Sequence, residues 1–207
     1  MKTKKIFLSL FTLTIIFMIF NCNEKENLMD GTNADISETE KEDLIFLREE
    51  EKLARDVYLY ADDKYNIKIF SNISQSEQSH MDSVLALLIK YNLEDPVIDE
   101  KGVFSNSYIQ ELYNTLVSQV DISLIDALIV GATIEDLDIN DITEFESNTE
   151  KYDILNVYDN LKCGSRNHLR GFTDQLELNS TVYEPQFISV EEFEDIVESD
   201  PEKCGGN

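Results

Sequence analysis

The spacing of apolar residues constrains the fold of this 207-residue chain more than any other feature. In four long segments, inward-facing residues recur at alternating intervals of three and four positions, which places them on one face of an α-helix. Glycine and proline number only 7 and 3, which favours long helices over strands and turns. We therefore predict an all-α bundle of four main helices, at about residues 37–63, 71–91, 123–146 and 153–178, in one domain.

Two local signals refine this prediction. Ser37 and Glu40 fit a capping box, so the first helix should begin there. A shorter segment, about residues 106–119, is apolar at Ile109, Leu112, Tyr113 and Leu116. We expect it to form a crossover helix between the second and third main helices.

Each predicted inward face has apolar ends and a polar middle. The polar members are Glu51 on the first helix, Glu77 and His80 on the second, Glu135 and Asp138 on the third, and His168 on the fourth. Glu77 and His80 form a Glu-x-x-His, in which the two side chains lie one helical turn apart on the same face. Glu49 and Glu50 should turn away from this face into solvent.

These six inward polar residues favour a metal site. A buried, unpaired carboxylate costs several kcal/mol unless it is protonated, paired or bound to a cation, and no inward position carries lysine or arginine. A single inward histidine or acid is more often a hydrogen-bonded core residue, but coincidence at the middle of four helices favours a dinuclear metal site. Carboxylate and imidazole ligands without thiolates favour iron or manganese, and zinc is compatible.

Several motifs resemble a known family. The run Glu51-Lys52-Leu53-Ala54-Arg55, followed by Glu77-x-x-His80, Glu135 and His168, resembles the ferritin-like superfamily, and in particular the rubrerythrin pattern Glu-x-x-Ala-Arg. Residues 48–58, 76–81 and 164–170 are similar to the bacterial and archaeal ferritin-like family catalogued as domain of unknown function 2202, over about residues 44–187. The resemblance implies a ferritin-like bundle with two metal ions. Ser165 departs from the superfamily pattern, which has a second ligand glutamate there; Asp138 would restore the count of four carboxylates.

Three functions are compatible with such a site. The first is oxidoreductase chemistry of a di-iron oxidase or peroxidase type with oxygen or peroxide, in which Glu77 bridges the metals and His80 and His168 each bind one. The second is extracytoplasmic metal binding or buffering without turnover, and the third is a purely structural metal. The electron donor is unknown, because the chain contains no Cys-x-x-Cys module like those that many rubrerythrins carry.

The amino-terminal segment has the features of an export signal. Lys2, Lys4 and Lys5 precede an apolar run at residues 6–20, and Cys22 follows. This resembles a lipoprotein signal with Cys22 as the lipidated residue, although an uncleaved anchor or ordinary cleavage remain alternatives. We assign residues 1–21 to the signal, 22–40 to an acidic tether, 41–187 to the bundle and 188–207 to an acidic tail. The protein is then expected to be exported and held at a membrane by a lipid.

Net charge and cysteine content limit the classes of ligand and indicate which cysteines can pair. The formal net charge is −25, from 42 acidic and 17 basic residues, which argues against nucleic-acid binding. In an oxidising compartment, Cys163 and Cys204 are the thiols left to pair if Cys22 is lipidated. The alternatives are a disulfide between them, or a buried Cys163 with Cys204 in a frayed tail.

Overall fold

The computed structural model describes residues 36–205, and these residues form six α-helices without a strand. The prediction of an all-α fold is therefore confirmed. The predicted export signal, Cys22 and nearly all of the predicted tether lie outside the described residues. The helices are α1 (Glu38–Tyr65), α2 (Lys68–Lys90), α3 (Ser107–Val120), α4 (Leu124–Ser147), α5 (Tyr152–Leu178) and α6 (Val190–Glu198).

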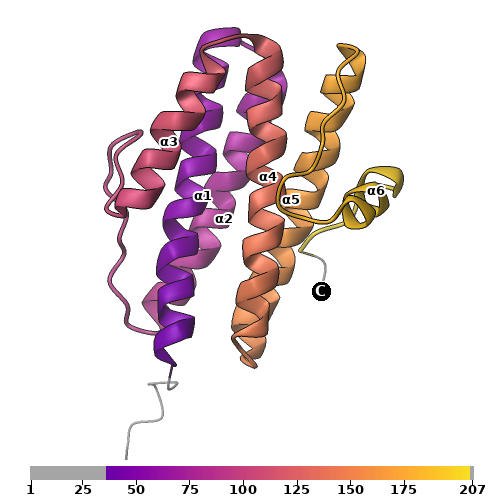
Figure 1. Ribbon diagram of the computed structural model, residues 1–207. Helices are drawn as coiled ribbons and strands as arrows, with labels where there is room; N and C mark the ends of the chain where they lie inside the picture. Colours follow the sequence, from indigo (N-terminus) through magenta and orange to yellow (C-terminus); the bar gives the residue numbers. More distant parts are fainter. Residues whose placement is uncertain (1–35, 206–207) are drawn as a thin grey trace, which may run out of the picture. The chain divides into compact units, whose positions relative to one another are not determined.

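Four of these helices form a bundle. Helices α1 and α2 pack against each other, as do α4 and α5, and the two pairs meet through α1 with α4 and through α2 with α5. Figure 1 shows that the connection through α3 returns the chain to the end from which α2 started, so α2 and α4 run in the same direction. Helix α3 contacts α1 and α4 on the outside of the bundle, as expected for a crossover element.

The helix boundaries follow local capping chemistry. Ser37 and Glu40 form the predicted capping box, with the Ser37 hydroxyl 3.1 Å from the Glu40 amide and the Glu40 carboxylate 2.8 Å from the Ser37 amide. Helix α1 ends at Asn66, whose φ of 52° is left-handed, a conformation that asparagine tolerates. Helix α2 then starts at Lys68, three residues earlier than expected, because only two residues connect the two helices.

The apolar core has two parts with the polar residues between them. One cluster contains Ala54 and Phe172, among others, and the second contains Leu47 and Leu87. Along each main helix, the chain passes from one apolar cluster to the other through the predicted polar positions. The pattern of apolar ends and a polar middle is therefore present in three dimensions.

The carboxyl-terminal segment is more ordered than an acidic tail. Helix α6 lies within it and packs against α5, burying Ile196. Asp136 of α4 stabilises the loop before α6, because its carboxylate accepts hydrogen bonds from the amides of residues 186–188. No helix among residues 36–205 has the length and apolar character that a membrane crossing requires.

Candidate metal centre

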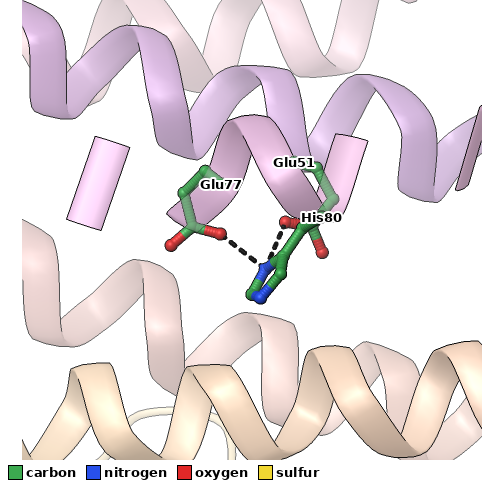
Figure 2. Close-up of side chains that lie close together, drawn as sticks. All are labelled: Glu51, Glu77 and His80. Atoms are coloured by element: carbon green, nitrogen blue, oxygen red, sulfur yellow. Dashed lines mark hydrogen bonds and ion pairs between the residues drawn. The ribbon is translucent and has the colours of Figure 1, made fainter. Parts of the chain in front are cut away.

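Glu51, Glu77 and His80 form the first group of potential ligands, and they come from α1 and α2. The His80 Nδ1 atom lies 2.7 Å from Glu77 Oε2 and 3.1 Å from Glu51 Oε2. Figure 2 shows both carboxylates converging on this one ring nitrogen. One atom from each residue lies within 4.8 Å of the others, which is close enough for a shared metal ion.

A second group contains Glu77 again, with Glu135 of α4 and His168 of α5. The His168 Nδ1 atom lies 2.9 Å from Glu77 Oε1 and 3.3 Å from Glu135 Oε2. Glu77 therefore places one oxygen beside each histidine, and the centroids of the two imidazole rings are 5.7 Å apart. The two groups share Glu77, and a shared carboxylate is what a dinuclear site requires of a bridging ligand.

The burial and hydrogen bonding of these residues test whether a metal would fit. Glu51, Glu77 and Glu135 are fully buried, and the exposed fractions of the His80 and His168 side chains are 11% and 12%. Each Glu77 oxygen faces a histidine Nδ1 atom and has no other polar partner, and Glu51 Oε1 lacks a hydrogen-bond partner. Unpartnered buried carboxylate oxygens are costly, and a cation relieves that cost. The oxygen and imidazole donor set fits iron, manganese or zinc.

Without a metal, protons and mutual charges must balance the group. Burial raises the pKa of Glu51, His80 lowers it, and the charge of Glu77 raises it further; the resulting pKa is about 7. Burial disfavours the charged form of His168, but Glu77 and Glu135 outweigh it and raise its pKa to about 10. Burial opposes ionisation of Glu77, yet His168 and His80 hold its pKa well below the usual range. Metal binding would therefore displace protons from the histidines.

Two further residues position these ligands. The Tyr58 hydroxyl donates a hydrogen bond of 2.5 Å to Glu135 Oε1, which leaves the other Glu135 oxygen facing His168. Gly164 provides space for the His80 ring, because a Cβ atom at this position would lie 2.6 Å from His80 Nε2. This role of Gly164 is not readable from the sequence, because a glycine within a helix carries no signal of the ring that packs against it.

Asp138 is not a member of either group. It is buried and neither carboxylate oxygen has a hydrogen-bond partner, but it belongs to neither cluster of potential ligand atoms. It lies one helical turn beyond Glu135, and its side chain is shorter than that of glutamate. Ser165 is also buried, and its hydroxyl donates to the Leu161 carbonyl within α5.

The expectation that Glu49 and Glu50 face solvent was wrong for both. Glu49 is 2% exposed and accepts hydrogen bonds from the amides of Ser105 and Asn106, which precede α3. Glu50 is 1% exposed, and neither of its carboxylate oxygens has a hydrogen-bond partner. The loop before α3 covers Glu49, and Asp141 of α4 is a close neighbour of Glu50. The sequence pattern of α1 alone did not indicate either contact.

The buried basic residues of α1 do not neutralise the centre. Lys52 is 1% exposed and bonds Asp56 at 2.7 Å, together with two backbone carbonyls of the crossover connection. Arg48 pairs with Asp95 and Arg55 with Asp56. These basic residues therefore do not pair with the acids of the two ligand groups, which face one another and the two histidines.

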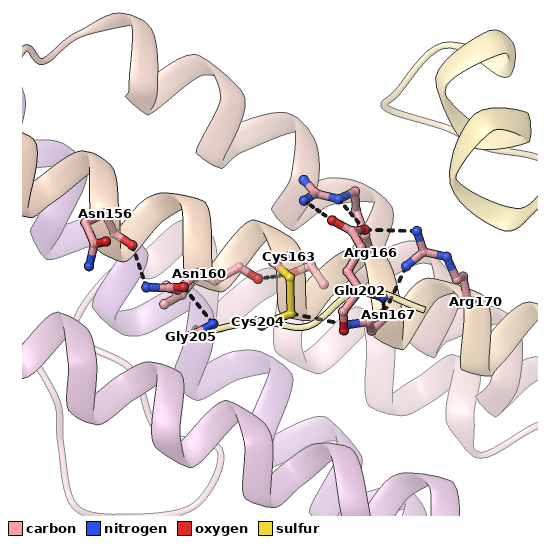
Figure 3. The surroundings of a disulfide bond; sticks show 11 residues. Asn156, Asn160, Cys163, Arg166, Asn167, Arg170, Glu202, Cys204 and Gly205 are labelled. Atoms are coloured by element: carbon pink, nitrogen blue, oxygen red, sulfur yellow. Dashed lines mark hydrogen bonds and ion pairs between the residues drawn. A yellow bond between two sulfur atoms is a disulfide. The ribbon is translucent and has the colours of Figure 1, made fainter. Parts of the chain in front are cut away.

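Cys163 and Cys204 form a disulfide, which is one of the two alternatives considered from the sequence. It attaches the segment after α6 to α5, as Figure 3 shows. Glu202 strengthens the attachment by pairing with Arg166 at 2.5 Å and Arg170 at 2.9 Å. The carboxyl-terminal segment is thus fixed to the helix that carries His168.

The comparisons with known proteins agree with this architecture. Residues 40–200 match the family described as "Uncharacterized protein domain (DUF2202)". The chain is 54% identical over 169 residues to the uncharacterized protein MJ0754 of Methanocaldococcus jannaschii, which covers 81% of this chain and 91% of that protein. It is also similar to a crystal structure of hypothetical protein MJ0754 from Methanococcus jannaschii DSM 2661, with a TM-score of 0.80, 55% identity, and coverage of 81% of this chain and 97% of that one. The chain is therefore a member of the DUF2202 family, as its motifs indicated.

Proposed function

We propose that this protein is a ferritin-like dinuclear metal protein that carries out oxidoreductase-type chemistry with oxygen or peroxide. The observation that carries the proposal is Glu77, which is fully buried and directs one oxygen to each of two histidines. This arrangement supports one imidazole per metal ion and a carboxylate between the two ions. Iron is the preferred metal, and manganese and zinc suit the same donors.

Each residue would have a distinct role. Glu51 and His80 would hold one ion and Glu135 and His168 the other, with Glu77 shared between them. When bound, two redox-active ions supply electrons to oxygen or peroxide in pairs. Tyr58 keeps Glu135 oriented through its hydrogen bond, and the apolar clusters on both sides limit the access of water to the ligands. The geometry of the ligands supports the metal, and oxygen or peroxide as the substrate follows from the family resemblance.

The second candidate function is capture or buffering of a divalent metal outside the cytoplasm, without turnover. It is favoured by the export features of residues 1–22 and by the Cys163–Cys204 disulfide, since disulfides persist in oxidising compartments. The same features support our proposal that the protein is exported and lipid-anchored through Cys22. A solely structural metal would require the bundle to depend on the ion for folding.

Metal binding is tested with purified, metal-free protein offered ferrous iron, manganese or zinc separately. We expect about two ions per chain and a rise in melting temperature on loading. The variant Glu77→Gln should lose most of the bound metal, whereas Asp82→Asn, at an exposed position of the same helix, should bind as the wild type does. A wild-type protein that takes up none of the three metals would refute the proposal.

Turnover is tested by loading ferrous iron anaerobically and mixing with oxygen or peroxide in a stopped-flow spectrometer. Rapid oxidation of the bound iron, repeated after re-reduction, supports the oxidoreductase. Iron that stays ferrous for minutes with either oxidant supports metal capture instead. A metal that cannot be removed without unfolding the bundle would favour the structural role.

A further inference from the structure

A second group of acids lines a groove between α1 and α4. The groove has a volume of about 510 Å³ and also touches Asn106 at the start of α3. Its lining contains four carboxylates and no lysine or arginine; the acids are Glu42, Asp43, Asp141 and Glu144. Such a groove attracts cations and repels anions, because the low-dielectric walls concentrate the negative potential.

The carboxylates become progressively more buried from the groove toward the centre. Glu42 and Glu144 are exposed, Asp141 is half-buried, and Glu50 and Asp138 are fully buried. Asp141 and Glu51 are the strongest charged neighbours of Glu50, and Glu50 and Glu51 are those of Asp138. Glu50 therefore has charged neighbours both in the groove and in the first metal group.

The lack of hydrogen-bond partners separates Glu50 and Asp138 from structural acids in the same bundle. Glu49, one residue before Glu50, accepts bonds from two backbone amides. Asp136, two residues before Asp138, accepts bonds from three backbone amides and the Tyr183 hydroxyl. All four carboxylate oxygens of Glu50 and Asp138 are buried without such a partner. Their environment provides nothing that stabilises the charge, which is the condition that a transiently bound cation would relieve.

We propose that the groove between α1 and α4 is the uptake route for the divalent metal, and that Glu50 and Asp138 are a transfer site between the groove and the two ligand groups. The inference rests on the proposed metal function. Imidazole suits ferrous ion better than oxygen-only donors do, so the ion moves on to the histidines. The proposed route assigns a role to Glu50 and Asp141, and it explains why Asp138 is buried although it belongs to neither ligand group.

A second groove reaches the centre from the other side, and it serves as the competing route. It lies between α2 and α5, has a volume of about 430 Å³, and is lined by His168 and by Asn167, Lys68 and Asp174, among others. Lys68 and Asp174 have opposite charges, so this groove lacks the excess of acids found between α1 and α4. The electrostatic argument therefore selects the groove between α1 and α4 for a cation.

The test measures how fast metal-free, full-length protein takes up cobaltous ion, followed by stopped-flow absorption. Glu50→Gln should slow uptake about tenfold or more, because it removes the charge that draws the ion inward. The equilibrium number of bound ions should remain that of the wild type, since no ligand is lost. Asp141→Asn, at the half-buried position of the groove, should slow uptake in the same direction. The matched control is Asp174→Asn in the competing groove, which should leave the rate unchanged.

The outcomes separate this inference from the metal centre itself. Wild-type protein that binds no cobalt, iron or manganese would overturn the centre, and the route with it. Wild-type binding with unchanged uptake rates in Glu50→Gln and Asp141→Asn would overturn the route alone. A lower equilibrium stoichiometry in Glu50→Gln would make Glu50 a ligand and overturn its role in transfer. Slow uptake in Asp174→Asn alone would assign the route to the other groove.

Salt dependence gives an independent measurement. Uptake by the wild type should slow as ionic strength rises, because salt screens the exposed acids of the groove. The triple variant Glu42→Gln, Asp43→Asn, Glu144→Gln should take up metal more slowly at low salt and depend less on ionic strength. An unaltered salt dependence in this variant would contradict steering by the groove.

Discussion

The disulfide between Cys163 and Cys204 should contribute a large share of the stability of this domain. The two cysteines are separated by 41 residues. Closing a loop of that length removes about 13 cal/mol/K of entropy from the unfolded chain, or about 4 kcal/mol at 25 °C. In a domain of this size, each kcal/mol shifts the melting temperature by about 2–4 °C. The variant Cys204→Ser should therefore melt about 8–16 °C below the wild type.

Cys204 is the better of the two positions to change. Its side chain is exposed, whereas Cys163 is buried and its replacement would also disturb packing within α5. The ion pairs of Glu202 with Arg166 and Arg170 remain in the variant and keep the segment attached, so the loss arises mainly in the unfolded state.

The assay is thermal unfolding of metal-free protein, with and without a reducing agent. Reductant should bring the wild type to the melting temperature of Cys204→Ser and leave the variant unaffected. Lys203→Ser, a change at the neighbouring exposed residue, should melt close to the wild type. Wild type and Cys204→Ser that melt within about 2 °C of each other would refute the loop-closure reasoning.

Three further predictions follow from the contacts of single side chains. Asp136→Ala should lower the free energy of unfolding by about 3–5 kcal/mol in chemical denaturation, because three backbone amides lose their buried acceptor; a loss below about 1 kcal/mol would contradict this. The hydrogen bond from Arg166 is the largest influence on the pKa of Glu202 and helps to lower it from 4.5 to about 2. Glu202→Gln should therefore be less stable than the wild type at neutral pH. This difference in stability should shrink as the pH falls from 4.5 toward 2, because the Glu202 carboxylate becomes protonated. Equal pH profiles of the two proteins would exclude that contribution. Tyr58→Phe leaves a buried oxygen of Glu135 without its donor, so unfolding of the metal-free protein should cost about 1–3 kcal/mol less; unchanged stability would show that the hydrogen bond contributes nothing net.

The sequence by itself determined the four main helices, the crossover helix and the helix faces that carry the candidate ligands. Alternating intervals of three and four residues identify one face of a helix, because side chains at this spacing project in the same direction. That regularity was sufficient to place Glu51, Glu77, His80, Glu135 and His168 in the middle of the bundle, where the structure brings them together. The Ser37 capping box was also readable, since its two hydrogen bonds join residues only three positions apart.

The tertiary structure alone decided how these residues pair and which other acids are buried. Spacing along one helix cannot show that Glu77 reaches histidines on two different helices, because that contact depends on how α2 and α5 pack. Glu50 lies outside the inward pattern of α1, yet it is buried and has Asp141 of α4 as a close neighbour. The choice between a disulfide and two separate cysteines likewise depended on where the chain returns after α6. A helix face is a local property of the sequence, whereas burial and partnership are set by segments that are distant in the chain.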